Sequence, residues 1–146
     1  MVSRKLMRIL APMAFLAMSQ GAAAATLVVT KSISCTCCEG WVDHMRKAGF
    51  DVEVHSVADV SPTAKRLGVP DKLRSCHTAK IGDYVIEGHV PAADVKRLLA
   101  QKPKAAGLAV PGMVVGSPGM ETGARAEPYK TLLFTKDGKT KVFASH

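Results

Sequence analysis

Aromatic residues are scarce in this chain of 146 residues, in which one Trp, two Tyr and four Phe make up 5% of the sequence. The Lys and Arg residues are scattered, and they do not alternate with stacking side chains as nucleic-acid binding would need. After the first 25 residues no apolar run approaches the roughly 20 residues of a membrane span. We therefore expect no nucleic-acid partner, and no membrane span in the rest of the chain.

Common enzyme signatures are also missing. The sequence contains neither a glycine-rich loop that could cradle phosphate nor an HExxH pattern. Cys76 and His77 are adjacent, and on a strand they would point to opposite faces, which makes a nucleophile–base dyad awkward. These absences favour a metal-binding protein over a hydrolase or a transferase, and they leave a redox activity open.

Residues 1–25 follow the order of a secretory signal peptide. Three basic residues precede a mostly apolar run at 9–18, and Gly and Ala fill positions 21–25. We expect cleavage near Ala25 and export of residues 26–146 as a single soluble domain. This remainder holds 17 Lys and Arg against 12 Asp and Glu, and its net charge of +5 suits a solvated surface.

Hydrophobic patterning predicts an α/β domain. We expect strands at 27–34 and 50–57, a helix at 39–48, and a short helix at 61–69 with Ser61 as its N-cap. A hairpin at 79–90, a helix at 91–101, a strand-like segment at 108–120 and a hairpin at 129–143 should follow. The order is typical of a thioredoxin-like fold with a CxxC at a helix N-terminus, an inserted hairpin–helix segment and a C-terminal hairpin. It would place Pro111 opposite the CxxC.

Three of the four cysteines fall within four positions, at Cys35, Cys37 and Cys38. An exported chain with four cysteines suggests disulfides, yet the adjacent pair 37–38 would be a strained and rare bridge. At a helix N-terminus the partial positive charge favours thiolates, which are both nucleophiles and soft metal ligands. A structural bridge, a redox-active dithiol and a metal site therefore all remain open.

Further soft donors stand in separate segments of the chain. Cys76 is followed directly by His77, and beyond the signal peptide the only methionines are Met45, Met113 and Met120. Each of these methionines lies beside a histidine or in a Pro-Gly-Met turn, although methionine is commonly a core filler. Thiolate and thioether ligands together select Cu(I) over harder ions.

Zinc is the less favoured metal, because Cys-x-Cys-Cys is not a zinc-ribbon spacing and the methionines would go unused. His44 lies two helical turns beyond the cysteines, about 10 Å along the axis, so it belongs to a second site or is structural. His77 and His89 are equally compatible with ligand and structural roles.

These blocks together resemble the CopG-like proteins of bacterial copper and heavy-metal resistance clusters, a family also catalogued as a domain of unknown function. The resemblance runs from Leu27 to Glu121. It rests on the CxCC motif, Trp41-Val42-x-His44-Met45, LRSCHT at 73–78, EGHVP at 87–91, and two Pro-Gly-Met turns at 111–113 and 118–120.

The resemblance implies a periplasmic, thioredoxin-like domain that binds copper. Cu(I) is the favoured oxidation state, and one domain could bind more than one copper ion. Its partners would be the metal ion and periplasmic copper-handling proteins. The implied metal ligands are Cys35, Cys37, Cys38, Cys76, His44, His77, Met113 and Met120.

Two other functions compete with copper binding. A thiol-disulfide or copper-linked oxidoreductase would use Cys35 and Cys38 as the attacking and resolving thiols. In that case Cys37 would compete as a third thiol. The other alternative is an exported domain whose four cysteines form two bridges, with Cys76 as one partner.

Overall fold

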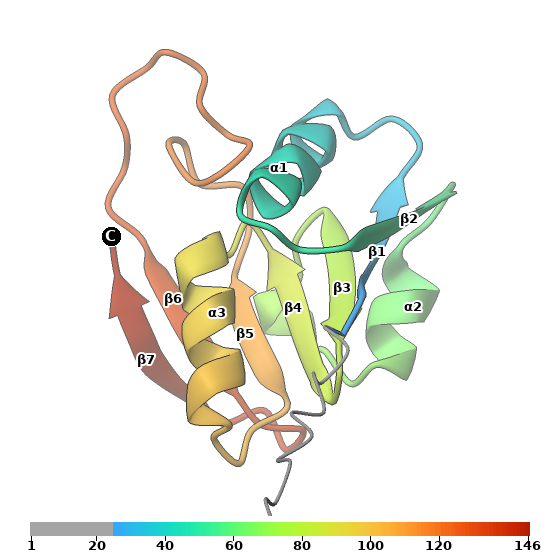
Figure 1. Cartoon of the computed structure of the whole chain (residues 1–146), viewed down its shortest axis with the longest axis vertical. Helices are drawn as coiled ribbons and strands as arrows, with labels where there is room; N and C mark the ends of the chain where they lie inside the picture. The colour runs from blue at the N-terminus through green and yellow to red at the C-terminus, as the bar shows by residue number, and fades with distance from the viewer. Residues whose placement is uncertain (1–24) are drawn as a thin grey trace, which may run out of the picture.

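The computed structural model describes residues 25–146, so the expected signal peptide lies outside the described residues. Seven strands form one sheet in the order β2-β1-β3-β4-β5-β6-β7 (Figure 1). The strands are β1 (Leu27–Ser32), β2 (Val52–Val57), β3 (His77–Ile81), β4 (Tyr84–Gly88), β5 (Gly107–Val110), β6 (Lys130–Phe134) and β7 (Thr140–Ser145). The helices are α1 (Thr36–Lys47), α2 (Ser61–Arg66), the 3-10 turn η1 (Asp71–Leu73) and α3 (Ala92–Gln101).

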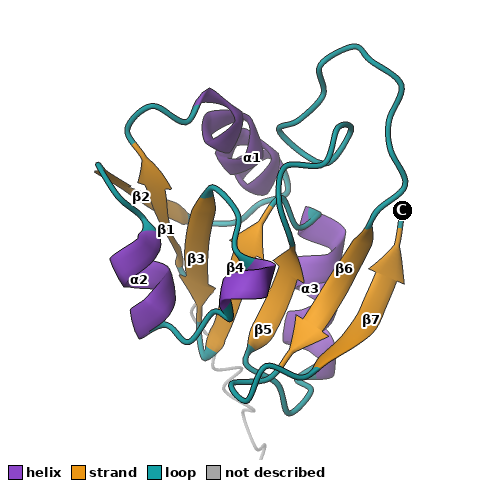
Figure 2. Ribbon diagram, turned by 180° about the vertical axis from the view of Figure 1, so that it is seen from behind, coloured by secondary structure: helices purple, strands orange, loops and turns teal. Residues whose placement is uncertain are grey.

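The sheet is mixed. β1 and β2 are parallel, as are β4 and β5, and helices α1 and α3 make the two parallel crossovers. The other neighbouring strands are antiparallel. α1 and α3 cover one face of the sheet, whereas α2 and η1 lie on the other face (Figure 2). The predicted α/β class is therefore confirmed as a seven-stranded mixed sheet with helices on both faces.

Each face of the sheet has its own apolar core. Under α1 and α3, the side chains of Trp41, Met45 and Leu98 pack on strand residues and are fully buried. On the other face Ala64, Leu73 and Phe134 form a smaller cluster. Burial of one large apolar side chain contributes about 1.5–3 kcal/mol. Tertiary packing therefore holds α1, the helix that carries the cysteines, in place on the sheet.

The structure differs from the expected elements at several ends. α1 begins at Thr36 instead of 39, because the Cys35 side chain caps it and accepts a hydrogen bond from the Cys38 N–H at 3.3 Å. The N-cap of α2 is Val60 and not Ser61, and α3 begins after Pro91. None of the helices within residues 25–146 combines the length and apolar character that crossing a bilayer would require.

The expected strand-like segment at 108–120 is only partly a strand. β5 ends at Val110, because Pro111 has no N–H for the ladder and Gly112 turns the chain at φ +74°. Residues 111–129 then form a long loop that returns over the end of the sheet near α1 (Figure 1). This loop closes over the site described next.

Candidate metal centre

The three clustered cysteines lie where β1 leads into α1. Cys35 is the N-cap of α1 and forms a disulfide with Cys38, while Cys37 is free and its Sγ lies 3.3 Å from Cys35 Sγ. Beside this turn the buried Lys31 of β1 pairs with Glu39 in the first turn of α1, with Nζ and Oε1 2.7 Å apart. This ion pair ties the two elements together on either side of the cysteine motif.

Cys76 brings the fourth sulfur to the same place. It directly precedes β3, whose neighbour is β1, and its Sγ lies 3.5 Å from Cys38 Sγ and 4.0 Å from Cys37 Sγ. The ligand atoms of Cys35, Cys37, Cys38 and Cys76 all lie within 4.8 Å of one another. Four sulfurs from two distant segments therefore converge on one point.

Two histidines extend the cluster into the protein. His77 begins β3 and His89 follows β4, and both are fully buried. Cys76 Sγ lies 3.1 Å from His89 Nε2 and 3.6 Å from His77 Nδ1. Cys76 thus belongs to two groups, one of four sulfurs and one formed with the two imidazoles.

The loop after β5 holds His89 in one orientation. His89 Nδ1 lies 2.8 Å from the carbonyl oxygen of Pro118, and because a carbonyl can only accept, Nδ1 carries the proton. The lone pair of His89 is then on Nε2, which faces Cys76 Sγ. A hydrogen bond from the second ring nitrogen is the usual way in which proteins orient a histidine ligand.

The same loop packs directly on the cysteine helix through Gly119. A Cβ atom at this position would lie 2.5 Å from the carbonyl oxygen of Cys37 and 2.6 Å from the backbone nitrogen of Trp41. The φ of Gly119 is +86°, which other residues rarely adopt. Only glycine therefore fits between the loop and α1.

Glu87 of β4 fastens the segment that carries Cys76 and His77. This buried carboxylate accepts the Ser75 N–H at 2.8 Å and the Thr78 hydroxyl at 2.6 Å, on either side of the two ligand candidates. Burial raises the pKa of the Glu87 carboxyl, while the hydrogen bonds from Thr78 and Ser75 act in the opposite direction. Glu87 therefore positions Cys76 and His77, and it belongs to neither of the two ligand groups within residues 25–146.

Replacement of Glu87 by Gln should loosen this segment, because the amide has only one acceptor oxygen for two donors. We expect the variant to lose about 1–3 kcal/mol of unfolding free energy and about 10–100-fold in metal affinity. Denaturant unfolding and a competitive metal titration would measure the two effects. Glu53→Gln is the matched control, since Glu53 is exposed and its ion-pair partner among the described residues is His55. Equal metal affinity in both variants would contradict the role assigned to Glu87.

Burial sets the protonation of the site in the absence of metal. It raises the pKa of the Cys76 thiol to about 11, with the charge of Cys37 adding to the effect. Burial, together with the neighbouring His89, lowers the pKa of His77 to about 3. The pKa of His89 is also lowered by burial. Both imidazoles are therefore neutral near pH 7, which is the form that binds metal.

The depressed pKa of His77 predicts a loss of stability in mild acid. Below pH 6.5, the ordinary pKa of histidine, His77 binds a proton in the unfolded chain but stays neutral in the folded chain. The unfolding free energy therefore falls as the pH falls toward 3. Each such histidine contributes a slope of up to about 1.4 kcal/mol per pH unit. Denaturant unfolding of the metal-free protein between pH 6.5 and 5 would measure the slope. His77→Leu should reduce the slope and leave the share of His89, and an unchanged slope would contradict the assignment.

The structure brings some of the expected ligands together and places others elsewhere. The four cysteines and His77 meet in the cluster. His44 lies outside both groups, is half-exposed, and pairs with Glu121 at 2.7 Å. Met113 and Met120 lie in the loop after β5, where the Met113 side chain is 58% exposed. Their thioethers remain candidate ligands by prediction only.

The segment next to the CxxC is the one that carries Cys76. Pro111 lies one residue before Gly112, whose N–H donates to the carbonyl of Arg74 at 3.2 Å, so it borders the Cys76 segment. Among residues 25–146 every peptide bond is trans. That Pro111 lies opposite the CxxC stays a prediction, since the contacts in the described part of the chain place its neighbour Gly112 beside the Cys76 segment.

The sequence gives Glu87 no part in the site and leaves His89 between a ligand and a structural role. A histidine ahead of a helix carries no sequence signal for its partner. Both residues stand in the EGHVP block at 87–91, and their spacing of two puts them at the end of β4. Only the pairing of β3 with β4 brings them beside Cys76.

Known proteins share this arrangement of the chain. A family described as "Protein of unknown function, DUF411" matches residues 73–120, which include Cys76, both histidines and the Pro-Gly-Met turns. A comparison with curated proteins found no match. Two solved structures named copper resistance protein CopG, form 1 and form 2, are each 42% identical to this chain and cover 85% of it.

The match extends over nearly the whole of those structures. This chain covers 98% of form 1 and 99% of form 2, with TM-scores of 0.80 and 0.79. These two structures and this chain therefore share a fold and, at 42% identity, a large part of their sequence. By this likeness the chain belongs to the CopG-like family of copper resistance proteins.

Proposed function

We propose that this chain binds copper as Cu(I) in the periplasm, in the service of copper resistance. The observation that carries the proposal is the convergence of four cysteine sulfurs with the imidazoles of His77 and His89 around the shared Cys76. Sulfur-rich ligand sets select Cu(I), and neutral imidazole also suits copper. The two solved structures of similar sequence are named as copper resistance proteins.

The described form is the oxidised state of the site. Only Cys37 and Cys76 are free while Cys35 and Cys38 are bridged. Reduction of this disulfide by two electrons and two protons would present four thiols to the metal. Because burial keeps the Cys76 thiol protonated, metal uptake should also release protons. We infer that full copper capacity requires the reduced state.

The arrangement of the strands supports a thioredoxin-like interpretation of the fold. The order β2-β1-β3-β4, with β1 parallel to β2 and β3 antiparallel to both neighbours, surrounds a CxxC at the start of α1. The disulfide at that place favours, as a second candidate, a thiol-disulfide or copper-linked oxidoreductase. The periplasmic location follows from the expected signal peptide.

An anaerobic Cu(I) titration against a competing chelator would test the proposal. The reduced chain from Thr26 onward, the form expected after signal cleavage, should take up at least one equivalent of Cu(I). The same protein with the disulfide intact should take up less, and insulin reduction would be measured alongside. Absence of uptake by the reduced protein would refute copper binding, and insulin reduction in that case would favour the oxidoreductase.

A further inference from the structure

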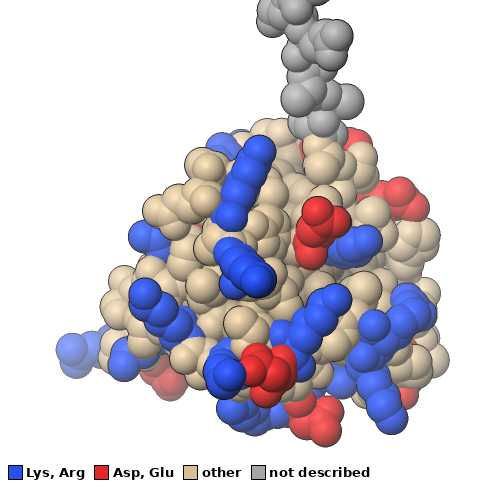
Figure 3. Space-filling view, turned by 90° about the horizontal axis from the view of Figure 1, so that it is seen from below, with Lys and Arg blue, Asp and Glu red and all other residues tan. Residues whose placement is uncertain are grey.

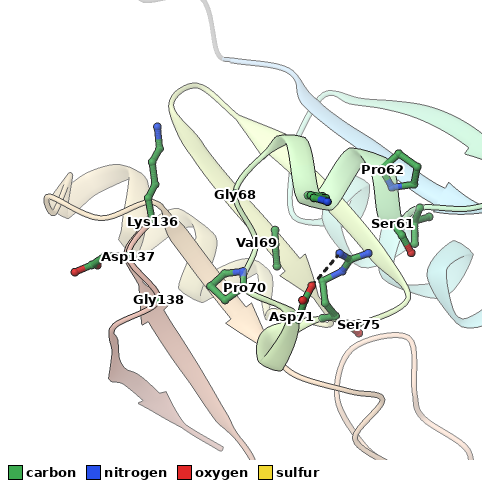
Figure 4. Close-up of a pocket in the computed structure, with 13 residues that line it drawn as sticks. Ser61, Pro62, Gly68, Val69, Pro70, Asp71, Ser75, Lys136, Asp137 and Gly138 are labelled. Atoms are coloured by element: carbon green, nitrogen blue, oxygen red, sulfur yellow. Dashed lines mark ion pairs between the residues drawn. The ribbon is translucent and has the colours of Figure 1, made fainter.

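A groove lies on the sheet face that carries α2 and η1, and its lining residue Ser75 connects it to the metal centre, since Ser75 Oγ lies 3.9 Å from Cys76 Sγ. It has a volume of about 1100 Å³ and runs between the α2–η1 segment and the β6–β7 turn. Figure 4 shows Ser61, Asp71 and Ser75 on one side of it and Lys136 and Asp137 on the other. Seven of the thirteen lining residues are polar or charged, and the others are Val, Pro and Gly.

Arg74 is the unusual side chain of this groove. It is only 20% exposed, and its Nε atom is buried without a hydrogen-bond partner among the described residues. Its two ion pairs are long: Nη1 lies 3.9 Å from Asp71, as the dashed line in Figure 4 marks, and Nε lies 4.0 Å from Glu87. A buried guanidinium nitrogen without a hydrogen-bond partner is uncommon, because such groups are normally satisfied.

Within residues 25–146 no acceptor lies within hydrogen-bond distance of the Arg74 Nε atom. Both oxygens of Glu87 already accept hydrogen bonds from Ser75 and Thr78. The Asp71 side chain is fully exposed to solvent. The backbone around Arg74 is held in place, since its carbonyl accepts the Gly112 N–H. The guanidinium therefore has a donor left for a ligand from outside.

The charge around the groove has the sign that such a ligand would need. Lys65 and Lys136 also line it, and neither forms an ion pair with any residue in the described part of the chain. Of the two carboxylates in the lining, Asp137 pairs with Lys139 at 2.8 Å and Asp71 with Arg74. Figure 3 shows that Lys and Arg predominate over Asp and Glu on the lower end of the molecule. A positive field of this kind attracts anions.

We propose that this groove binds a small oxyanion, a carboxylate or a phosphate, through the guanidinium of Arg74 with Lys65 and Lys136 in support. The planar fork of arginine matches two oxygens of either group, which lysine cannot do. The ligand is a free small anion, and its site lies two residues before Cys76 in the chain. The proposal does not rest on copper binding, although Ser75 and Glu87 connect the groove to Cys76.

Nuclear magnetic resonance titration of the metal-free, reduced chain from Thr26 onward would test the site. Succinate and inorganic phosphate are the two probes, each compared with sodium chloride at equal ionic strength. We expect saturable shifts confined to residues 61–75 and 136–138 with at least one probe. Saturation by succinate alone would identify a carboxylate site, and saturation by phosphate alone a phosphate site.

Two variants make the assignment to Arg74 specific. Arg74→Lys should weaken binding by about tenfold or more, the loss expected for one charge-assisted hydrogen bond. Arg46→Lys is the matched control, because Arg46 is exposed on α1 and pairs with Asp43. If Arg74→Lys unfolds, the double variant Lys65→Ala with Lys136→Ala should still weaken binding, since both side chains are exposed lysines. Absence of saturable shifts with both probes, or wild-type affinity in these variants, would overturn the proposal.

Discussion

Replacement of Cys76 by Ser should lower the Cu(I) affinity of the reduced protein more than replacement of any other single cysteine. Cys76 is the only residue shared by the sulfur group and the histidine group, so its loss removes a ligand from both. The loss of an outer-shell partner typically costs about 10–100-fold in metal affinity. Loss of this shared ligand should therefore exceed about 100-fold. An anaerobic competition titration with a Cu(I) chelator measures the change directly.

The matched controls separate ligand loss from structural damage. His55→Ala removes a histidine that pairs with Glu53 on the exposed side of β2, and it should leave the affinity unchanged. Cys35→Ser removes a sulfur that belongs to only one group, so a smaller loss is expected. If Cys76→Ser folds normally and binds Cu(I) as tightly as the unmodified protein, the shared-ligand arrangement is wrong.

Replacement of Gly119 by Ala should cost about 2–4 kcal/mol of unfolding free energy and weaken copper binding as well. The added Cβ would meet the Cys37 carbonyl and the Trp41 nitrogen, both backbone atoms that cannot turn aside. The loop would have to lift off α1, and His89 would then lose the Pro118 carbonyl that fixes its tautomer. Denaturant unfolding and the copper titration on the same variant would show both effects.

Gly123→Ala provides a control in the same loop. Gly123 also has a positive φ, +78°, but an added Cβ there has nothing within 4 Å. It should therefore show only the backbone cost of roughly 1 kcal/mol, with copper affinity intact. Equal losses of stability in the two variants would mean that the close approach of Gly119 to α1 does not hold the loop. A lowered affinity in Gly123→Ala would mean that the loop acts on the site by another route.

Local patterns predicted most of the individual elements. The alternation in residues 50–57 and the Asp137–Gly138 turn gave β2 and the β6–β7 hairpin nearly as observed. The start of α1 was missed because a cysteine is not a usual N-cap, and Cys35 takes that role through its sulfur. The end of β5 was missed because apolar residues continue past Pro111 although the ladder does not.

The sequence also predicted a part of the candidate site, because metal-binding residue types and short motifs are visible in it. Cysteine and histidine next to each other at 76–77 stand out in a sequence, and so does the CxCC motif. His44 stands out equally, yet its side chain pairs with Glu121 in the loop after β5. His89 gave a weaker signal, although its Nε2 lies 3.1 Å from Cys76 Sγ. Residue type indicates which side chains can bind a metal, and it does not indicate which of them will meet.

The amino-acid sequence by itself determined the α/β class, the soft donor chemistry and the family resemblance, because these depend on periodicity, residue type and local motifs. Only the tertiary structure decided that Cys76 joins the CxCC, that His89 completes the second group, and that Glu87 and Gly119 hold these parts in place. Those contacts join residues 9 to 82 positions apart, through the pairing of β1 with β3 and β3 with β4 and through the packing of a long loop on α1. Pairing and packing of this kind are set by the whole chain at once, so no local pattern encodes them.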